Sequence, residues 1–233
     1  GLCVPMVANC GGRYILAGWV GGSGWAFVTL HRELVQHEGG RLGIRWMPEL
    51  TPNPDELDKI AEVKKVASGE ELKLDGKTSY YLECRVKPQK NGRVGLAVSG
   101  SGKPFVFELN TERQKVQTLE TDNINSFTEE VKALYEYIPE MPEERTSCAQ
   151  IPSENIHTNS HDFAIANVRE LADEYTLKII FHYEKKSDSI VMDAEIGEGR
   201  TFVSNRPDFK VSGIKFLTEN AEITDLKLCK MGE

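Results

Sequence analysis

Short segments in which apolar and polar residues alternate recur along the chain from about Leu72 onward. In one of them Tyr80, Leu82 and Val86 fall on one face, with polar side chains between them. A period of two is typical of a half-buried β-strand, because successive side chains of a strand point to opposite faces. Many such strands separated by polar turns predict an all-β fold, an antiparallel β-sandwich of two packed sheets. The alternation recurs in the segments 94–98, 105–109, 177–183, 190–196, 201–204, 213–217 and 223–228.

The first 50 residues instead carry apolar runs separated by glycine-rich turns. The runs 14–20, 25–34 and 42–46 are divided at 21–24 and 38–40, which predicts a short antiparallel meander. Prolines then interrupt the strand pattern, and apolar residues between Asp55 and Val66 recur at steps of three. We therefore expect a meander over 1–50, a linker with a short helix or irregular structure over 51–71, and the sandwich over 72–233.

The alternation is lost between about residues 120 and 162. Ser126 followed by Glu129 forms a capping box, and an apolar helical stripe that begins at Phe127 ends before Pro139. One amphipathic helix is expected in this insertion. The remainder, 140–160, is rich in Pro, Glu, Ser and Asn, which favours a long surface loop.

Composition excludes several classes of function. With 36 acidic and 28 basic residues the net charge is −8, which disfavours nucleic acid as a partner. No apolar run approaches the roughly 18 residues that a membrane span needs. The five cysteines are scattered and contain no CxxC pair, so neither a disulfide framework, a metal site nor a cofactor is predicted, and the compartment stays open.

Several motifs together resemble one known family. The N-terminal segments 12–20 (GRYILAGWV), 30–34 (LHREL) and 48–50 (PEL) resemble, in order and rough spacing, strands of the last propeller blade in the invertase and inulinase group, glycoside hydrolase family 32. In the C-terminal half, RTFVSNR at 200–206 and GIKFL at 213–217 follow two strands in the order found in that family's β-sandwich.

The resemblance implies a fold and a role. It implies that the meander closes a propeller whose remaining part precedes it, and that the sandwich is a concanavalin-like jelly roll. The chain would then be a non-catalytic accessory module that stabilises the upstream β-propeller of the same protein and contributes to binding of an oligo- or polysaccharide, in a periplasmic or extracellular setting. The open alternative is a lectin-like, carbohydrate-binding β-sandwich that acts alone or within a longer chain.

No catalytic residue is predicted. Enzymes of that family use two carboxylates, one as nucleophile and one as acid/base, and neither the family's nucleophile motif nor its RDP motif occurs here. Glu83 and Cys84 reproduce the letters of the acid/base motif, but the alternation predicts Glu83 as a solvated strand residue. An enzyme in its own right therefore ranks last among the hypotheses.

Two other groups could bind a ligand. Asp193 and Glu195 share the outer face of their strand, where they could bind a cation or a sugar hydroxyl, although alternation alone predicts solvent-facing polar residues. His157 and His161 have the four-residue offset of metal ligands on a helix, with Asp162 adjacent, but their surroundings read as loop, so no metal site is predicted. His182 is expected to point outward.

The tryptophans are the candidate carbohydrate-binding residues. An exposed indole can stack on a sugar ring, which makes Trp19, Trp25 and Trp46 the candidates. The favoured alternative is that they pack the meander and its contact with the sandwich. Arg32 and Glu33 are expected to form a structural pair at the same junction.

Overall fold

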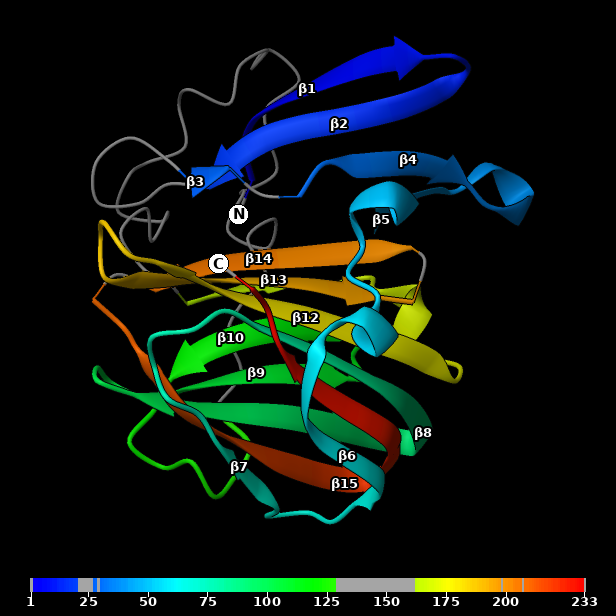
Figure 1. Cartoon of the computed structure of the whole chain (residues 1–233). Helices are drawn as coiled ribbons and strands as arrows, with labels where there is room; N and C mark the ends of the chain where they lie inside the picture. Colours follow the sequence, from blue (N-terminus) through cyan, green and yellow to red (C-terminus); the bar gives the residue numbers. More distant parts are fainter. Residues whose placement is uncertain are drawn as a thin grey trace, which may run out of the picture.

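The computed structural model describes residues 2–20, 27–28, 30–128, 162–197, 199–206 and 208–232. Within these residues a small N-terminal sheet lies against a larger curled β-sandwich (Figure 1). The expected all-β, antiparallel fold is confirmed. The helix expected after Ser126 lies almost wholly outside the described residues, and 126–128 are not helical.

The N-terminal sheet is an antiparallel meander with strand order β1-β2-β4-β5, and β3 also pairs with β2. Its first strand precedes the segments that the glycine-rich turns predicted. In the described part of the chain, no helix has the length and apolar character needed to cross a membrane. The strands are β1 (Leu2–Cys10), β2 (Arg13–Val20), β3 (Phe27–Val28), β4 (Arg32–Gln36) and β5 (Leu42–Trp46).

Two long strands, β8 and β15, organise the sandwich because each contributes to both of its layers. Residues 80–86 of β8 pair with β12 and with residues 223–230 of β15. Residues 93–98 pair with β9, and residues 93–100 pair with residues 211–219 of β15. The strands are β6 (Asp58–Val66), β7 (Glu71–Lys73), β8 (Tyr80–Gly100), β9 (Phe105–Asn110), β10 (Lys115–Glu120), β11 (Phe163–Ile165), β12 (Tyr175–Glu184), β13 (Ser189–Ile196), β14 (Arg200–Arg206) and β15 (Val211–Lys230).

The two layers enclose one apolar core. Layer I has the order β14-β13-β12-β8-β15-β6, and layer II has the order β11-β10-β9-β8-β15-β7. The alternating apolar residues face inward, as expected for Tyr80, Leu82 and Val86, all of which are buried. Phe107 of layer II meets Phe202 of layer I with ring centroids 5.2 Å apart. Burial of such side chains is the main source of the sandwich's stability.

The segment 51–71 differs from its prediction. In place of a short helix it contains a 3-10 turn, η3 (Pro54–Glu56), followed by strand β6, which pairs with β15. Another 3-10 turn, η2 (Pro48–Leu50), lies just before the segment. The three-residue apolar spacing is coincidental, because Ile60 is exposed and only Val66 is fully buried. The free edge of β15 supplies the backbone partners of β6, and this tertiary context outweighs the local pattern.

A bend separates the two halves of β8. Pro88 pairs with Ala221 and Arg93 with Glu219, so residues 89–92 bulge out opposite a single residue of β15. Gly92 is buried there, and a Cβ at this position would lie 2.6 Å from the backbone oxygen of Asn220. A bulge of this kind lets one strand pass from one layer to the other.

Gly92→Ala is therefore expected to lower the free energy of unfolding by about 1–3 kcal/mol, because the backbone around Asn220 has to move. Urea denaturation would measure the change. Gly232→Ala is the control, since a Cβ there meets nothing within 4 Å. Equal stabilities of the Gly92 variant and the wild type would contradict this account of the bend.

Candidate functional site

Charges alternate in sign across the outer face of layer I. The register places Lys227 between Glu62 and Glu83 on the neighbouring strands. In the same row Lys178 lies between Glu83 and Glu195, and Lys178 Nζ contacts Glu195 Oε1 at 2.9 Å. Opposite charges on directly opposed strand residues stabilise a sheet. The polar face that alternation predicts is thus an ordered charge row.

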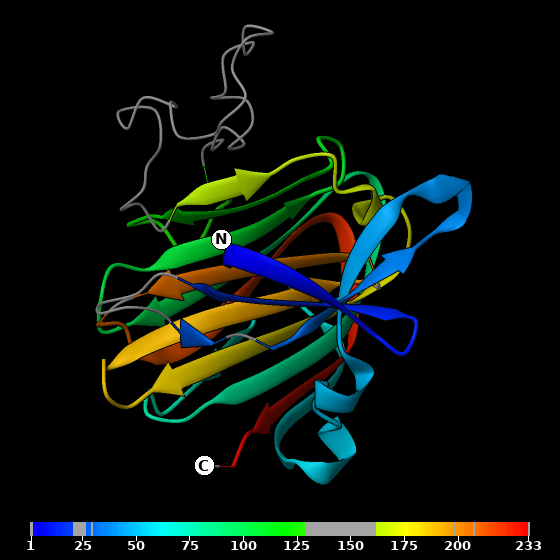
Figure 2. The same cartoon turned by 90° about the horizontal axis from the view of Figure 1, so that it is seen from above.

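The N-terminal sheet covers the β13–β14 end of this face. In Figure 2 the N-terminal strands lie across β13 and β14, and β2 and β5 contact β14. Asp193 and Glu195 are consequently only 4% and 3% exposed. Strand alternation placed both residues on the outer face, but the expectation that they face solvent is wrong, because a second sheet packs over them.

A buried ion pair joins the two sheets. Arg32 Nη2 donates to Asp193 Oδ1 at 2.7 Å, and Trp46 Nε1 donates to the same oxygen at 3.0 Å. Arg32 Nε also donates to Thr201 Oγ1 at 3.1 Å, and the backbone N–H of Trp46 donates to Glu195. Arg32 is 2% exposed. Burial raises the pKa of Asp193, whereas the Arg32 charge and the Trp46 N–H act in the opposite direction.

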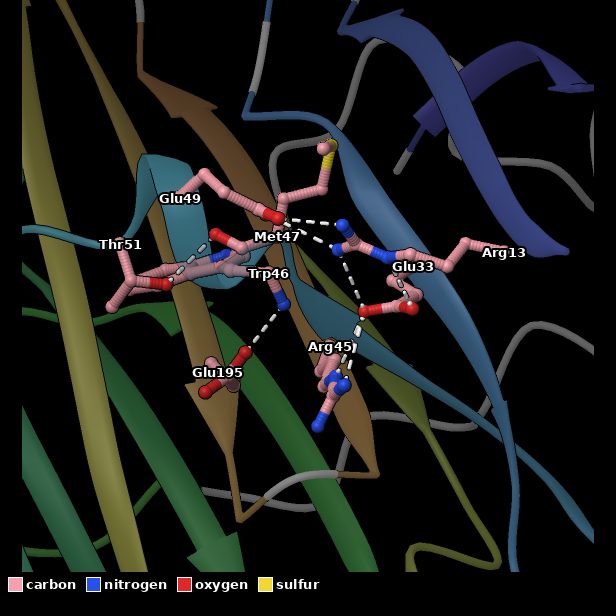
Figure 3. Close-up of polar contacts among 8 residues, drawn as sticks. All are labelled: Arg13, Glu33, Arg45, Trp46, Met47, Glu49, Thr51 and Glu195. Atoms are coloured by element: carbon pink, nitrogen blue, oxygen red, sulfur yellow. Dashed lines mark hydrogen bonds and ion pairs between the residues drawn. The ribbon is translucent and has the colours of Figure 1, made fainter. Parts of the chain in front are cut away.

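Glu33 points to the other side of β4 and has separate partners. Arg13 binds it through two N–H···O contacts of 2.8 and 3.1 Å, and Arg45 Nη2 binds it at 3.0 Å. Arg13 also reaches Glu49, as Figure 3 shows. These hydrogen bonds lower the pKa of Glu33 and bring that of Glu49 to about 2. Arg32 and Glu33 therefore both form ion pairs at the junction, but not with each other.

A cleft of about 330 Å³ opens beside this junction and is called the junction cleft here. Its wall combines Arg45 and Trp46 with the turn residues Thr51 and Asn53. Its floor is part of the charge row, namely Glu83, Lys178 and Glu195. Small-molecule sites often lie between packed units and begin at about this size.

A second cleft, of about 410 Å³, lies on the outer face of layer II and is called the layer II cleft. All of the described residues that line it are polar or charged. Its floor includes Arg93, Glu108, Asn110 and Gln117, from β8, β9 and β10. Sequence reasoning missed these residues. The available signal is the polar residues at 108 and 110 of β9 and at 115 and 117 of β10, two apart in each strand, which by itself indicates an outer face.

Of the three candidate tryptophans, the structure describes the side chain of Trp46 but not those of Trp19 and Trp25. Trp46 is 1% exposed and packs with Tyr81 and Ile180, so it supports the packing alternative and cannot act as an exposed sugar platform in this structure. Trp19 lies on β2 opposite Cys3 and Val28, but its side chain is outside the described part, as is all of Trp25. Sugar binding by these two tryptophans stays a prediction.

The remaining candidates have structural contacts. Glu83 accepts a hydrogen bond from Tyr81 Oη at 2.6 Å, and His182 is exposed, as expected. His157 and His161 lie outside the described residues. Asp162 contacts the buried Arg206 and accepts from the backbone N–H of Glu120 at 2.9 Å. Across the described ranges, no three His, Cys, Asp or Glu side chains are grouped so that they could hold a metal ion.

Solved structures with a similar fold are known, although no sequence comparison gives a match. No family model and no curated protein sequence matches the chain. The solved structure of Bombyx mori GH32 beta-fructofuranosidase BmSUC1 is similar at a TM-score of 0.55 and 14% identity, over 97% of this chain and 40% of that chain. A. japonicus CB05 is similar at a TM-score of 0.53 and 10% identity, over 95% and 40%.

The likeness extends over both the N-terminal sheet and the sandwich, since it covers nearly the whole chain. The chain spans about two fifths of the length of these two structures. A third structure, the galectin LEC-6 of Caenorhabditis elegans, matches at a TM-score of 0.43 and 11% identity, over 72% of this chain and 94% of that chain.

Arg32→Met is expected to destabilise the protein by about 3–5 kcal/mol at neutral pH, because the buried Asp193 carboxylate loses its counter-ion. Without Arg32 the folded-state pKa of Asp193 rises further above its unfolded value. The folded state then takes up a proton as the pH falls through that raised pKa, so the cost shrinks toward acid pH. Urea denaturation at several pH values measures both effects.

The matched control is Lys65→Met, which removes an exposed pair with Glu222 and should leave the free energy of unfolding almost unchanged at every pH. A cost for Arg32→Met as small as that of the control, or one that grows toward acid pH, would show that the junction does not depend on this ion pair.

Proposed function

We propose that the chain is a non-catalytic accessory module of a carbohydrate-processing protein of the GH32 type. In this proposal the sandwich holds the N-terminal sheet in place, and that sheet packs against an upstream β-propeller of the same protein. The observation that carries the proposal is a difference between two parts of the N-terminal sheet. One part packs on β13 and β14, where Arg32 and Trp46 bind Asp193. The open part, around β1 and β2, exposes large apolar and aromatic side chains.

The open part of the N-terminal sheet has the properties of an interface. Met6, Val7 and Tyr14 are 66%, 51% and 52% exposed, although all three are large and apolar or aromatic. In the described structure β1 pairs only with β2, so its other edge offers free backbone groups. Natural proteins generally cover such edges and such side chains. Further β-structure, such as a propeller blade, would cover both.

The carboxylates of the junction cleft support a role without catalysis. Glu195 accepts hydrogen bonds from Lys178 and from the backbone of Trp46, and Glu83 accepts one from Tyr81. A retaining glycosidase needs two carboxylates that address the same glycosidic bond. Here both carboxylates serve contacts within the fold, and the charge row accounts for their positions.

A second candidate function, carbohydrate binding, is favoured by the layer II cleft. This cleft is polar throughout its described lining and lies on a different layer from the junction. The two functions are compatible in one module, because docking of the N-terminal sheet uses layer I and the cleft uses layer II.

The accessory role predicts that Met6 is covered in the whole gene product. Hydroxyl-radical oxidation of Met6 should be fast in the isolated chain and slow in the full-length protein, because oxidation follows the exposure of the thioether. Met231, near the C-terminus, serves as the internal control and should react equally in both. Oxidation of Met6 at the same rate in both proteins would contradict the proposed docking.

The non-catalytic role predicts no release of reducing sugar from sucrose, inulin or aryl glycosides by the purified chain. The reason is that Glu83 and Glu195 are engaged in structural contacts. A sugar-release assay would include Glu83→Gln and Glu195→Gln as matched variants. Hydrolysis by the wild type that either substitution abolishes would overturn this part of the proposal.

A further inference from the structure

We propose that the layer II cleft is a binding site for a neutral saccharide, with Arg93 and Asn110 contacting hydroxyl groups and Glu108 acting as a positioning residue. The inference deepens the carbohydrate-related part of the proposed function and rests on it. It does not depend on the junction or on a propeller.

The floor of the cleft consists of two neighbouring cross-strand rows. In the first row, Arg93 lies between Glu219 of β15 and Asn110 of β9, and Asn110 is opposite Lys115 of β10. In the second row, Glu108 is opposite Gln117. Guanidinium, amide and carboxylate groups thus lie side by side on one sheet face. A guanidinium carries five N–H donors and an amide carries two, so donors remain for ligand hydroxyls after contacts within the floor are made.

Glu108 holds the floor in a single arrangement. It is 1% exposed, and its Oε1 accepts from Arg93 Nε at 3.0 Å and from Arg93 Nη2 at 2.7 Å. Its Oε2 lies 3.3 Å from the hydroxyl of Thr128, which also accepts from Gln117 Nε2 at 3.1 Å. A polar floor that is already ordered loses little entropy when a ligand binds.

Because Gly95 has no side chain, the ring of Phe127 can pack beside it and contact Arg93. It occupies the second row between Leu217 and Glu108, and a Cβ there would lie 3.2 Å from the ring of Phe127. The Phe127 ring fills this space, and the Arg93 guanidinium lies 4.3 Å from its centroid. Arg93 is therefore fixed by the ring as well as by Glu108, yet 28% of its side chain remains exposed.

Asn110 offers a donor toward the cleft. Its Oδ1 accepts from the backbone N–H of Arg113 at 3.1 Å, which orients the amide. Within the described part of the chain its Nδ2 makes no hydrogen bond, and the residue is half-buried. A saccharide hydroxyl is a suitable acceptor for this group.

The charge balance of the lining argues for a neutral ligand. Among the described residues of the lining, three cationic side chains, those of Arg93, Arg113 and Lys115, are matched by three carboxylates, those of Glu108, Glu112 and Glu219. Neither an anion nor a cation gains from such a lining, and its polar character disfavours a lipid or a flat aromatic compound. A cleft of about 410 Å³ falls within the range of about 300–1,000 Å³ for small-ligand sites.

The test is a titration of the full chain, labelled with ¹⁵N, with sucrose, lactose and maltotriose. Glucuronate and inorganic phosphate serve as anionic probes. At least one neutral sugar should shift the resonances of residues 91–95, 108–117 and 219–220, including the Asn110 side-chain amide. Arg93→Lys keeps the charge but loses the planar fork, and it should weaken binding about tenfold. Asn110→Ala should have a similar effect.

Arg85→Lys is the matched control, because Arg85 lies on the same strand but pairs with Glu174 away from the cleft, and it should bind like the wild type. The proposal is overturned if no neutral sugar shifts these residues, if only the anions do, or if Arg93→Lys and Asn110→Ala both bind normally. A negative titration together with protection of Met6 in the full-length protein would remove the saccharide site and leave the accessory role intact.

Discussion

The architecture depends on a buried contact between charges that belong to different sheets. Among the residues of the N-terminal sheet whose side chains are described, only Leu16 and Trp46 are buried and apolar, so this sheet has little core of its own. Arg32 and Asp193 lose their hydration when the sheets meet, and this cost is offset only when their geometry and that of Trp46 are correct. The contact therefore specifies where the sheet sits on the sandwich more than it adds stability.

Much of the fold could be predicted because the alternation of side chains is a local property. The inward positions of Tyr80 and Leu82 follow from it, and the structure confirms them. The strand β6 could not be predicted, because its side chains are mostly exposed and its partner β15 lies about 160 residues further along the chain. The continuity of β8 through its bend also depends on tertiary pairing, since Pro88 and Arg93 on either side of the bend pair with residues of β15.

The contacts of the candidate site could not be predicted from single segments, because they depend on how strands pair and how sheets pack. Alternation identifies Asp193 as an outer-face residue, but only the packing of β5 over β13 reveals that this face is buried. The charge row of Glu83, Lys178 and Glu195 requires the register of three strands, which no single segment contains. The same holds for Arg93 and Glu108, whose ion pair becomes visible only when β8 and β9 are aligned.

Hydrogen exchange in an Asp193→Asn variant tests the central claim most directly. The substitution preserves shape but removes the charge that Arg32 requires, so the account predicts that amides of β2, β4 and β5 lose protection while those of β9 and β10 keep it. Mass spectrometry of peptides from each strand would resolve the two sheets. Unchanged protection of β4 and β5, or an equal loss in both sheets, would contradict the claim that this ion pair holds the N-terminal sheet to the sandwich.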